Sequence, residues 1–146
     1  MHYMLMLLGI AGGVAVGSQA GVNAALGRNI GVLETAFVSF LVGAACLGVL
    51  VVTLGKGNLG GVTAVPAWQL IGGVLGGFYV FVMVTVVPQI GVAPTIMTII
   101  TGQILAGLVI DHFGVFGGRQ VPMNLSRGVG VVMLAAALML IFRKPE

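Results

Sequence analysis

Apolar residues run in five long stretches, separated by short segments that hold nearly all of the charged residues. The stretches cover residues 4–26, 35–54, 68–87, 91–110 and 122–142. Each is close to the ~20 residues that an α-helix needs to cross ~30 Å of hydrocarbon. None shows the alternation over about 10 residues that is typical of transmembrane β-strands. The pattern therefore predicts an all-α integral membrane protein with five transmembrane helices.

The third and fourth stretches carry the strongest part of this signal. Residues 57–110 contain no Asp, Glu, Lys or Arg, and the segment from Pro88 to Gly91 divides them into two helices. A soluble domain needs polar groups on its solvated faces, so it would not leave such a run uncharged. The fifth stretch is the weakest, and we expect Arg127 to snorkel at one of its ends. We expect one transmembrane domain over residues 1–146, with no soluble appendage.

Composition narrows the possible functions. The chain is 59% hydrophobic and 6% charged, against about 25% charged in an ordinary globular domain. Its net charge of +3 is scattered without a basic stripe, so we expect no nucleic-acid partner. The single cysteine, Cys46, leaves no internal disulfide and no metal constellation. With no catalytic triad, paired carboxylates or nucleotide loop, we expect no enzyme and no cofactor. The first stretch lacks a basic start and continues to Leu26, so we do not interpret it as a signal peptide.

The Lys and Arg residues divide evenly between the two sides of the membrane. One side receives Lys56, Arg119 and Arg127; the other receives Arg28, Arg143 and Lys144. Orientation normally follows an excess of Lys and Arg on the cytoplasmic side, and here there is no excess. Two interpretations stay open: a partner orients the chain, or the chain inserts both ways and pairs antiparallel with itself.

Glycine is too frequent, at 25 residues, for the loops to absorb. Small residues at every fourth position let a second helix backbone approach closely, which is how helices associate in lipid. Two helices carry such ridges, formed by Gly9, Gly13, Gly17, Gly21, Gly72 and Gly76. These ridges predict a tight helix bundle and say nothing about substrate.

Uncharged polar side chains within the spans are the candidate substrate contacts. Gln19 and Asn23 lie one turn apart on the first span, Tyr79 lies in the third and Gln103 in the fourth. The alternative is plain interhelical hydrogen bonding, typically worth about 1 kcal/mol or less. Two long amides on one helix face favour a cavity, so we predict that these four residues contact solute.

No acidic residue lies near the middle of a span. Glu34 and Asp111 lie at span ends, and His112 adjoins Asp111. Ionisable groups inside membrane helices usually mark ion or proton paths, whereas terminal acids are more often solvated or paired with a local arginine, here Arg28 or Arg119. Coupling or gating by Glu34, Asp111 and His112 is therefore a secondary hypothesis.

Three stretches of the sequence resemble a known family. Residues 17–23 run into 35–43, residues 72–80 into 87–94, and Gly102-Gln103 leads to Asp111-His112-Phe113-Gly114 and then Arg127. In these stretches the chain resembles the five-helix YdcZ-like branch of the drug/metabolite transporter superfamily, which is related to the four-helix small multidrug resistance proteins. The resemblance covers nearly the whole chain, and the run from Gln103 to Gly114 is its most specific part.

The resemblance implies a prokaryotic inner-membrane protein that forms half of a ten-helix, inverted-repeat transporter, completed by an antiparallel second copy. Small multidrug resistance proteins carry a membrane glutamate in the first helix, where this chain has Gln19 and Asn23. That departure argues against proton-coupled cation export but leaves transport in place.

We therefore expect a transporter that moves a small polar or amphipathic solute by alternating access. The alternatives are a passive pore or ion channel of the same architecture, a flippase for a lipid-linked substrate, or a membrane subunit that only scaffolds a partner. The expected partners are a second copy or a paired homologous subunit, membrane lipid and a small-molecule solute.

The even charge division makes dual topology testable. Two or three lysines added after Glu146 should drive the protein into one orientation, and the same lysines placed at the N-terminus should reverse it, because the added charge breaks the tie. Labelling of single introduced cysteines from each side of the membrane measures the orientation. If the unmodified protein labels from one side only, self-pairing in antiparallel fashion is wrong.

Overall fold

The structure is a computed structural model that describes residues 2–118 and 120–143. It separates into two compact units, Met1–Gln89 and Ile90–Glu146, and each is described by itself. Five α-helices are long and apolar enough to cross a membrane, and no strand occurs in the described residues. The predicted all-α membrane architecture is confirmed at this level.

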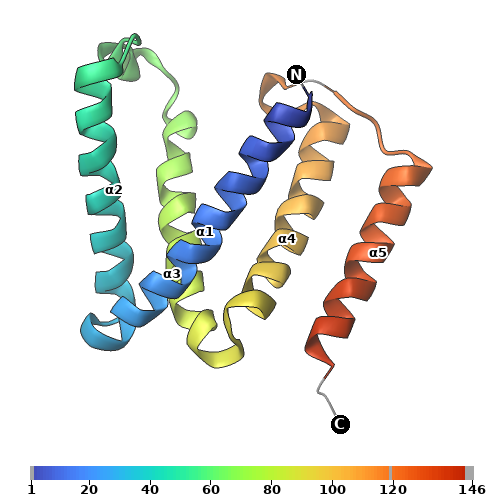
Figure 1. The fold of residues 1–146 in the computed structure, drawn as a ribbon. Coiled ribbons are helices and arrows are strands. Elements are labelled where there is room, and N and C mark those ends of the chain that lie inside the picture. The colour runs from blue at the N-terminus through green and yellow to red at the C-terminus, as the bar shows by residue number, and fades with distance from the viewer. Residues whose placement is uncertain (1, 119, 144–146) are drawn as a thin grey trace. The chain divides into compact units, whose positions relative to one another are not determined.

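The first unit holds three of the long helices (Figure 1). They are α1 (His2–Ile30), α2 (Val32–Leu54) and α3 (Ile71–Ile90), whose last residue begins the second unit. Two short 3-10 helices, η1 (Leu59–Ala64) and η2 (Ala67–Leu70), connect α2 to α3. The second unit holds α4 (Val92–Phe113), the short η3 (Val115–Gly117) and α5 (Leu125–Phe142).

The link between α1 and α2 is much shorter than the loop of residues 27–34 that the sequence pattern predicts. Only Gly31 separates the two helices, with φ 100° and ψ 162°. Its N–H donates to the carbonyl of Gly27 at 3.0 Å and its carbonyl accepts from the N–H of Thr35 at 3.1 Å. One residue thus ends α1 and begins α2, because glycine alone tolerates this backbone region.

Other helix ends follow local chemistry. Pro88 lies inside the last turn of α3, which continues to Ile90 instead of stopping at the proline. Helix α5 begins at Leu125, later than expected, because the Asn124 side chain caps it by accepting from the N–H of Arg127 at 2.9 Å. An asparagine at this position satisfies one of the free N–H groups of a helix start.

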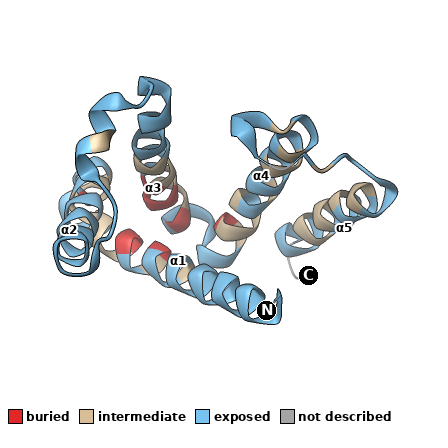
Figure 2. Cartoon of the chain, turned by 90° about the horizontal axis from the view of Figure 1, so that it is seen from above, coloured by how far each residue is buried: buried red, intermediate tan, exposed pale blue. Residues whose placement is uncertain are grey.

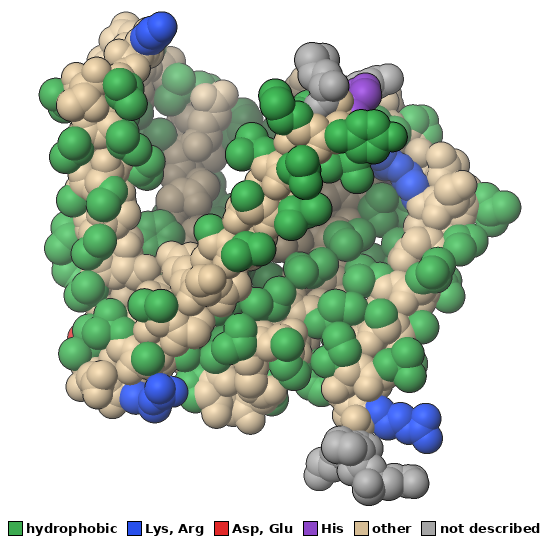
Figure 3. All heavy atoms as spheres, in the orientation of Figure 1, with side chains coloured by type: hydrophobic (Ala, Val, Ile, Leu, Met, Phe, Trp, Pro, Cys, Tyr) green, Lys and Arg blue, Asp and Glu red, His purple; other side chains and the backbone are tan. Residues whose placement is uncertain are grey.

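Many large apolar side chains are exposed, and hydrophobic side chains are spread over the helices on the face shown in Figure 3. The most hydrophobic window of each candidate span is at most 22% buried within the chain. In water this much exposed apolar surface would be untenable. Inside a bilayer, acyl chains or neighbouring transmembrane helices cover these faces, so the exposure agrees with a membrane-spanning protein.

The interior of the first unit lies between α1 and α3, whose buried residues are marked in Figure 2. Its buried apolar residues are Ala20, Ala24, Val80, Met83, Val84 and Val87. The buried apolar residues of α1 are thus small, and those of α3 are large. A Cβ added to Gly27 would lie only 2.5 Å from Cγ1 of Val84, so the two helices approach closely at this point and the glycine makes room for the valine.

The glycine ridges divide into packed and open positions. A Cβ added to Gly76 would lie 3.0 Å from Cζ of Phe40 on α2. At Gly9, Gly13, Gly21 and Gly72 an added Cβ would meet nothing within 4 Å. Gly76 therefore packs against its own chain, whereas the other four positions are open to a partner or to lipid.

This division predicts opposite outcomes for two leucine substitutions. Gly76→Leu should destabilise the folded chain by about 1–3 kcal/mol, because the new side chain overlaps the Phe40 ring, and Phe40→Ala should partly restore it. Gly13→Leu should leave unfolding in detergent unchanged and lower self-association in bilayers, because it fills the open ridge. Gly72→Leu, on the same helix as Gly76, is the matched control. If Gly13→Leu lowered the stability of the folded chain more than Gly76→Leu, the observed packing would be contradicted.

Candidate functional site

Three uncharged polar side chains meet between α1 and α2. The amide of Gln19 donates to Ser39 Oγ at 3.3 Å, and the amide of Asn23 donates to the same oxygen at 3.1 Å. We call Gln19, Asn23 and Ser39 the amide–serine cluster. Asn23 is buried at 6% exposure, whereas Gln19 is exposed.

The tight turn at Gly31 brings this cluster together. Asn23 and Ser39 are 16 residues apart, with Gly31 midway between them. In a helical hairpin joined by a single residue, positions equally far from the link lie opposite each other. The sequence analysis proposed Gln19 and Asn23 but did not include Ser39. The missing signal was the length of the link, which fixes the register of α2 against α1.

A cavity of about 230 Å³ adjoins the cluster. Gln19 and Ser39 form its polar end, and its remaining lining is Phe40, Gly43, Ala44 and Leu47. The cavity can therefore accept a small molecule that carries a hydrogen-bonding group on an apolar body. Such a mix of apolar wall and few polar groups is typical of small-molecule sites.

The cluster has hydrogen-bonding capacity left for a ligand. Ser39 Oγ accepts two N–H groups, so its own hydrogen remains free to donate. Within the described residues the amide oxygens of Gln19 and Asn23 have no partner, and no buried side-chain nitrogen or oxygen is unsatisfied. The cluster thus offers carbonyl acceptors and a hydroxyl donor without any full charge.

Tyr79 and Gln103 lie on other helices. Tyr79, on α3, is half-buried and adjoins the interior residue Val80. Its hydroxyl has no hydrogen-bond partner among the described residues, so it does not join the cluster through such a bond. Gln103 belongs to α4 in the second unit, where its side chain is exposed. Their contact with solute stays a prediction.

Asp111 and His112 hold the connection between α4 and α5. Asp111 Oδ2 pairs with Arg127 Nη1 at 3.3 Å, and the same nitrogen donates to the carbonyl of Val121 at 3.3 Å. His112 Nδ1 accepts from the N–H of Met123 at 3.1 Å. The partner of Asp111 is Arg127; Arg119 lies outside the described residues.

The Asp111–Arg127 pair is partly exposed, with 46% of the Asp111 and 27% of the Arg127 side-chain surface accessible. Such pairs typically contribute about 0–1 kcal/mol, so this pair chiefly fixes the position of the loop. Glu34, at the start of α2, is exposed and its carboxylate lies over Gly31, where an added Cβ would collide with it. Coupling or gating by these groups stays a hypothesis.

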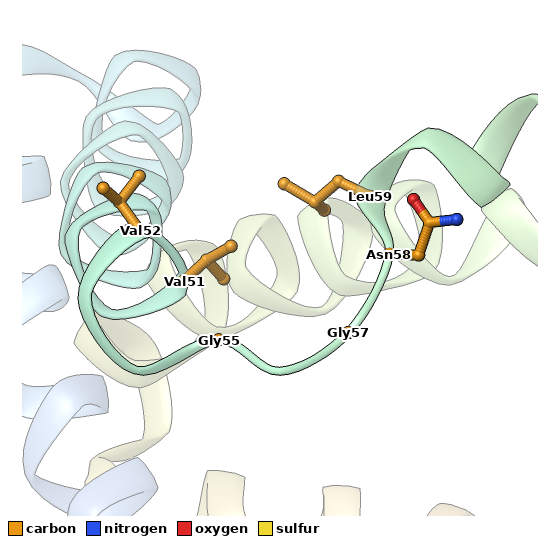
Figure 4. A pocket seen from close by; sticks show the side chains of 6 residues that line it. All are labelled: Val51, Val52, Gly55, Gly57, Asn58 and Leu59. Carbon is orange, nitrogen blue, oxygen red and sulfur yellow. The ribbon is translucent and has the colours of Figure 1, made fainter.

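Three further hollows are almost wholly apolar. One, of about 450 Å³, lies where α2 passes into η1 and is lined by Val51, Val52, Gly55, Gly57, Asn58 and Leu59 (Figure 4). Asn58 is its one polar side chain, and this side chain caps η1 by accepting from the N–H of Gly60 at 3.0 Å. The second, of about 460 Å³, lies between α2 and α3 and includes Phe37 and Phe78. The third, of about 370 Å³, lies between α4 and α5 beside His112.

Nowhere in residues 2–118 and 120–143 do three His, Cys, Asp or Glu side chains gather closely enough to hold an ion. Cys46 is exposed on α2 and unpaired. Of the polar groups described, the amide–serine cluster is the one that combines position within the spans with an adjoining cavity.

Sequence comparison decides the family. A family described as "Putative inner membrane exporter, YdcZ" matches residues 4–140. The chain belongs to this YdcZ family. It is also similar to the inner membrane protein YdcZ of Escherichia coli strain K12, with 32% identity over 85 residues. That match covers 57% of this chain and 55% of the relative, so the chain spans about half the length of the curated relative.

No solved structure matches the chain. Family membership and the five membrane-length helices together establish a multi-pass inner-membrane protein. They also confirm the resemblance to the YdcZ-like branch that the stretches around Gln19, Tyr79 and Gln103 suggested.

Ser39 should matter more for stability than other serines of the same helices. Ser39→Ala should cost about 1–3 kcal/mol of unfolding free energy, because the buried amide of Asn23 loses its partner. Ser18→Ala is the matched control, since Ser18 is exposed and donates only to the carbonyl of Val14 on its own helix. Unfolding of both variants in detergent measures the difference. Equal stability of the two would show that the cluster holds no buried amide in place.

Proposed function

We propose that this YdcZ-family protein is a transporter that exports a small polar or amphipathic solute across the inner membrane by alternating access. The observation that carries the proposal is the amide–serine cluster with its adjoining cavity of about 230 Å³. Burying a polar group within a membrane span costs free energy unless the group is hydrogen-bonded within the protein or binds a ligand. The family description as an inner membrane exporter supports the same activity.

The chemistry of the cluster limits the solute. Carbonyl acceptors and one hydroxyl donor suit a molecule with hydrogen-bond donors, and the apolar wall of Phe40 and Leu47 suits an apolar body. None of the described residues that line this cavity carries a charge that could balance a charged solute. A neutral or weakly basic amphipathic solute is therefore the best match.

The transporter would work as an antiparallel pair, of this chain with itself or with a homologous subunit. Two observations support pairing. The Lys and Arg residues divide three against three between the sides of the membrane, and the ridge positions Gly9, Gly13 and Gly21 are open in the single chain. A second copy packed on that ridge would complete an inverted repeat around a midplane site.

Substitution of the amides tests the site. Gln19→Leu and Asn23→Leu should weaken binding or uptake about 2–10-fold, the effect of losing one hydrogen bond, and Tyr79→Phe isolates the hydroxyl of that ring. Asn29→Leu is the matched control, because Asn29 is an exposed amide on the same helix that donates only to the carbonyl of Ala25. A thermal-shift screen of purified protein against metabolites and amphipathic amines first supplies the ligand.

Proteoliposomes loaded with that ligand then measure flux. Accumulation against a gradient supports a transporter, whereas strictly downhill flux would favour the passive pore. Asp111→Asn should abolish accumulation and spare downhill exchange if Asp111 couples transport. Arg127→Gln distinguishes this from a loop-positioning effect, because it breaks the same ion pair and keeps the carboxylate. Wild-type uptake by both amide variants would overturn the assigned site.

A further inference from the structure

The two shortest links of the chain share a sequence. Residues 30–35 read Ile-Gly-Val-Leu-Glu-Thr, and residues 90–95 read Ile-Gly-Val-Ala-Pro-Thr. The first link joins α1 to α2 and the second joins α3 to α4, and in each the glycine is the one residue outside the helices. Four of the six positions are therefore identical at equivalent places in two links of a single glycine between long helices.

The backbone of the two links is also the same. Gly31 has φ 100° and ψ 162°, and Gly91 has φ 91° and ψ 166°. This backbone region is essentially restricted to glycine. Gly31 and Gly91 thus share one rare backbone conformation, and each lies between two membrane-length helices. We infer that the chain makes the same type of turn at both links.

A threonine then holds each glycine from the following turn. Thr35 Oγ1 donates to the carbonyl of Gly31 at 2.7 Å, and Thr95 Oγ1 donates to the carbonyl of Gly91 at 2.6 Å. Each glycine carbonyl also accepts from the backbone N–H of the same threonine, at 3.1 Å and 3.3 Å. Both threonines are buried, at 0% and 1% exposure.

The equivalence extends into the helices that precede each link. With Gly31 placed on Gly91, three consecutive buried positions of α1 fall on buried positions of α3. The pairs are Ala20 with Val80, Asn23 with Met83, and Ala24 with Val84. Three glycines also coincide: Gly12 with Gly72, Gly13 with Gly73, and Gly17 with Gly77. The chain thus repeats a helix–glycine–helix segment in which equivalent positions of the first helix are buried.

We propose that the protein contains a tandem pair of helix–glycine–helix segments, residues 2–54 and 71–113, and that Gly31 with Thr35 and Gly91 with Thr95 are matched hinges at which the angle between the two helices of each segment changes. The hinge role rests on the proposed transport function, whereas the repeat does not. Because one residue joins the two helices, any change in their angle falls on the φ and ψ of that glycine. Hinges of this kind absorb backbone rotation at element ends.

The threonines are the positioning residues of these hinges. The hydroxyl adds a second hydrogen bond to a carbonyl that already begins the next helix, and it therefore fixes the orientation of the glycine peptide. A change in the angle between the two helices would rotate this carbonyl and lengthen the hydroxyl bond. Loss of the hydroxyl should therefore shift the balance between these angles, and a serine should preserve it.

Spin-label distances between α1 and α2 test the hinge. Labels at Met6→Cys on α1 and Val52→Cys on α2, in a Cys46→Ser background, use two exposed positions of the purified, reconstituted protein. Thr35→Val should change the ratio of distance populations about 2–10-fold, as expected from one hydrogen bond made in one state only. Thr35→Ser should match the wild type, and Gly31→Ala should leave a single population.

Gly48→Ala is the control, because a Cβ at Gly48 on α2 would meet nothing within 4 Å. If Thr35→Val kept the wild-type distance distribution and only lowered the melting temperature, the hinge role would be wrong. The hydroxyl bond of Thr35 would then only stabilise the fold. If Gly31→Ala does not fold, the comparison of Thr35→Val with Thr35→Ser decides alone.

The same distance measurement between α3 and α4 tests the repeat. Thr95→Val and Thr95→Ser, with labels at Val74→Cys and Val109→Cys in the same Cys46→Ser background, should reproduce the outcome of their Thr35 counterparts. A shift at Thr35 without one at Thr95 would overturn the matched pair. The hinge proposal and the transport proposal can fail separately. Shifted distances without any solute flux would support the hinges and reject transport. Solute flux with unchanged distances would support transport and reject the hinges.

Discussion

The bilayer offers no water to the backbone, and every N–H and C=O within it must find a partner inside the protein. Helices satisfy this demand within one segment, so the five spans are helices throughout. Connections then become the critical places, because each leaves unpaired groups at two helix ends. At Gly31 a single residue closes α1 with its N–H and begins α2 with its carbonyl. This single-residue link fixes how α2 runs back along α1, and it therefore fixes where polar side chains of the two helices meet.

The interior of the first unit is thin and asymmetric. Its buried apolar residues are alanines on α1 and valines and a methionine on α3, and Gly27 of α1 lies directly beside Val84 of α3. Small residues admit a close approach, and large ones fill the space, so the pairing gains dispersion contacts that lipid alone would not provide. Most other apolar side chains point outward. The fold is thus completed by its surroundings, either acyl chains or another transmembrane subunit on the open glycine ridge.

Charge and hydrogen bonding are separated along the chain. The charged groups of the second unit stabilise a connection: Asp111 holds Arg127, which also reaches the carbonyl of Val121. Away from the helix ends, the neutral side chains of Gln19 and Asn23 meet at Ser39. A molecule bound at this cluster would therefore be recognised by hydrogen bonds and shape rather than by charge.

The sequence alone determined the solvent, the helix class and the number of spans, because hydrophobic length is a local property that needs no knowledge of neighbours. It also pointed to Gln19 and Asn23, since their spacing of one turn places both on one face. Tertiary structure decided what that face meets. The partner is Ser39, whose position depends on the single-residue link at Gly31, and link length does not follow from hydropathy. Likewise Gly76 and Gly13 look alike in sequence, yet only the fold brings Phe40 against Gly76 and leaves Gly13 open. Contacts between segments far apart in the chain depend on turn geometry and on which side chains the neighbouring helix presents, and a local pattern contains neither.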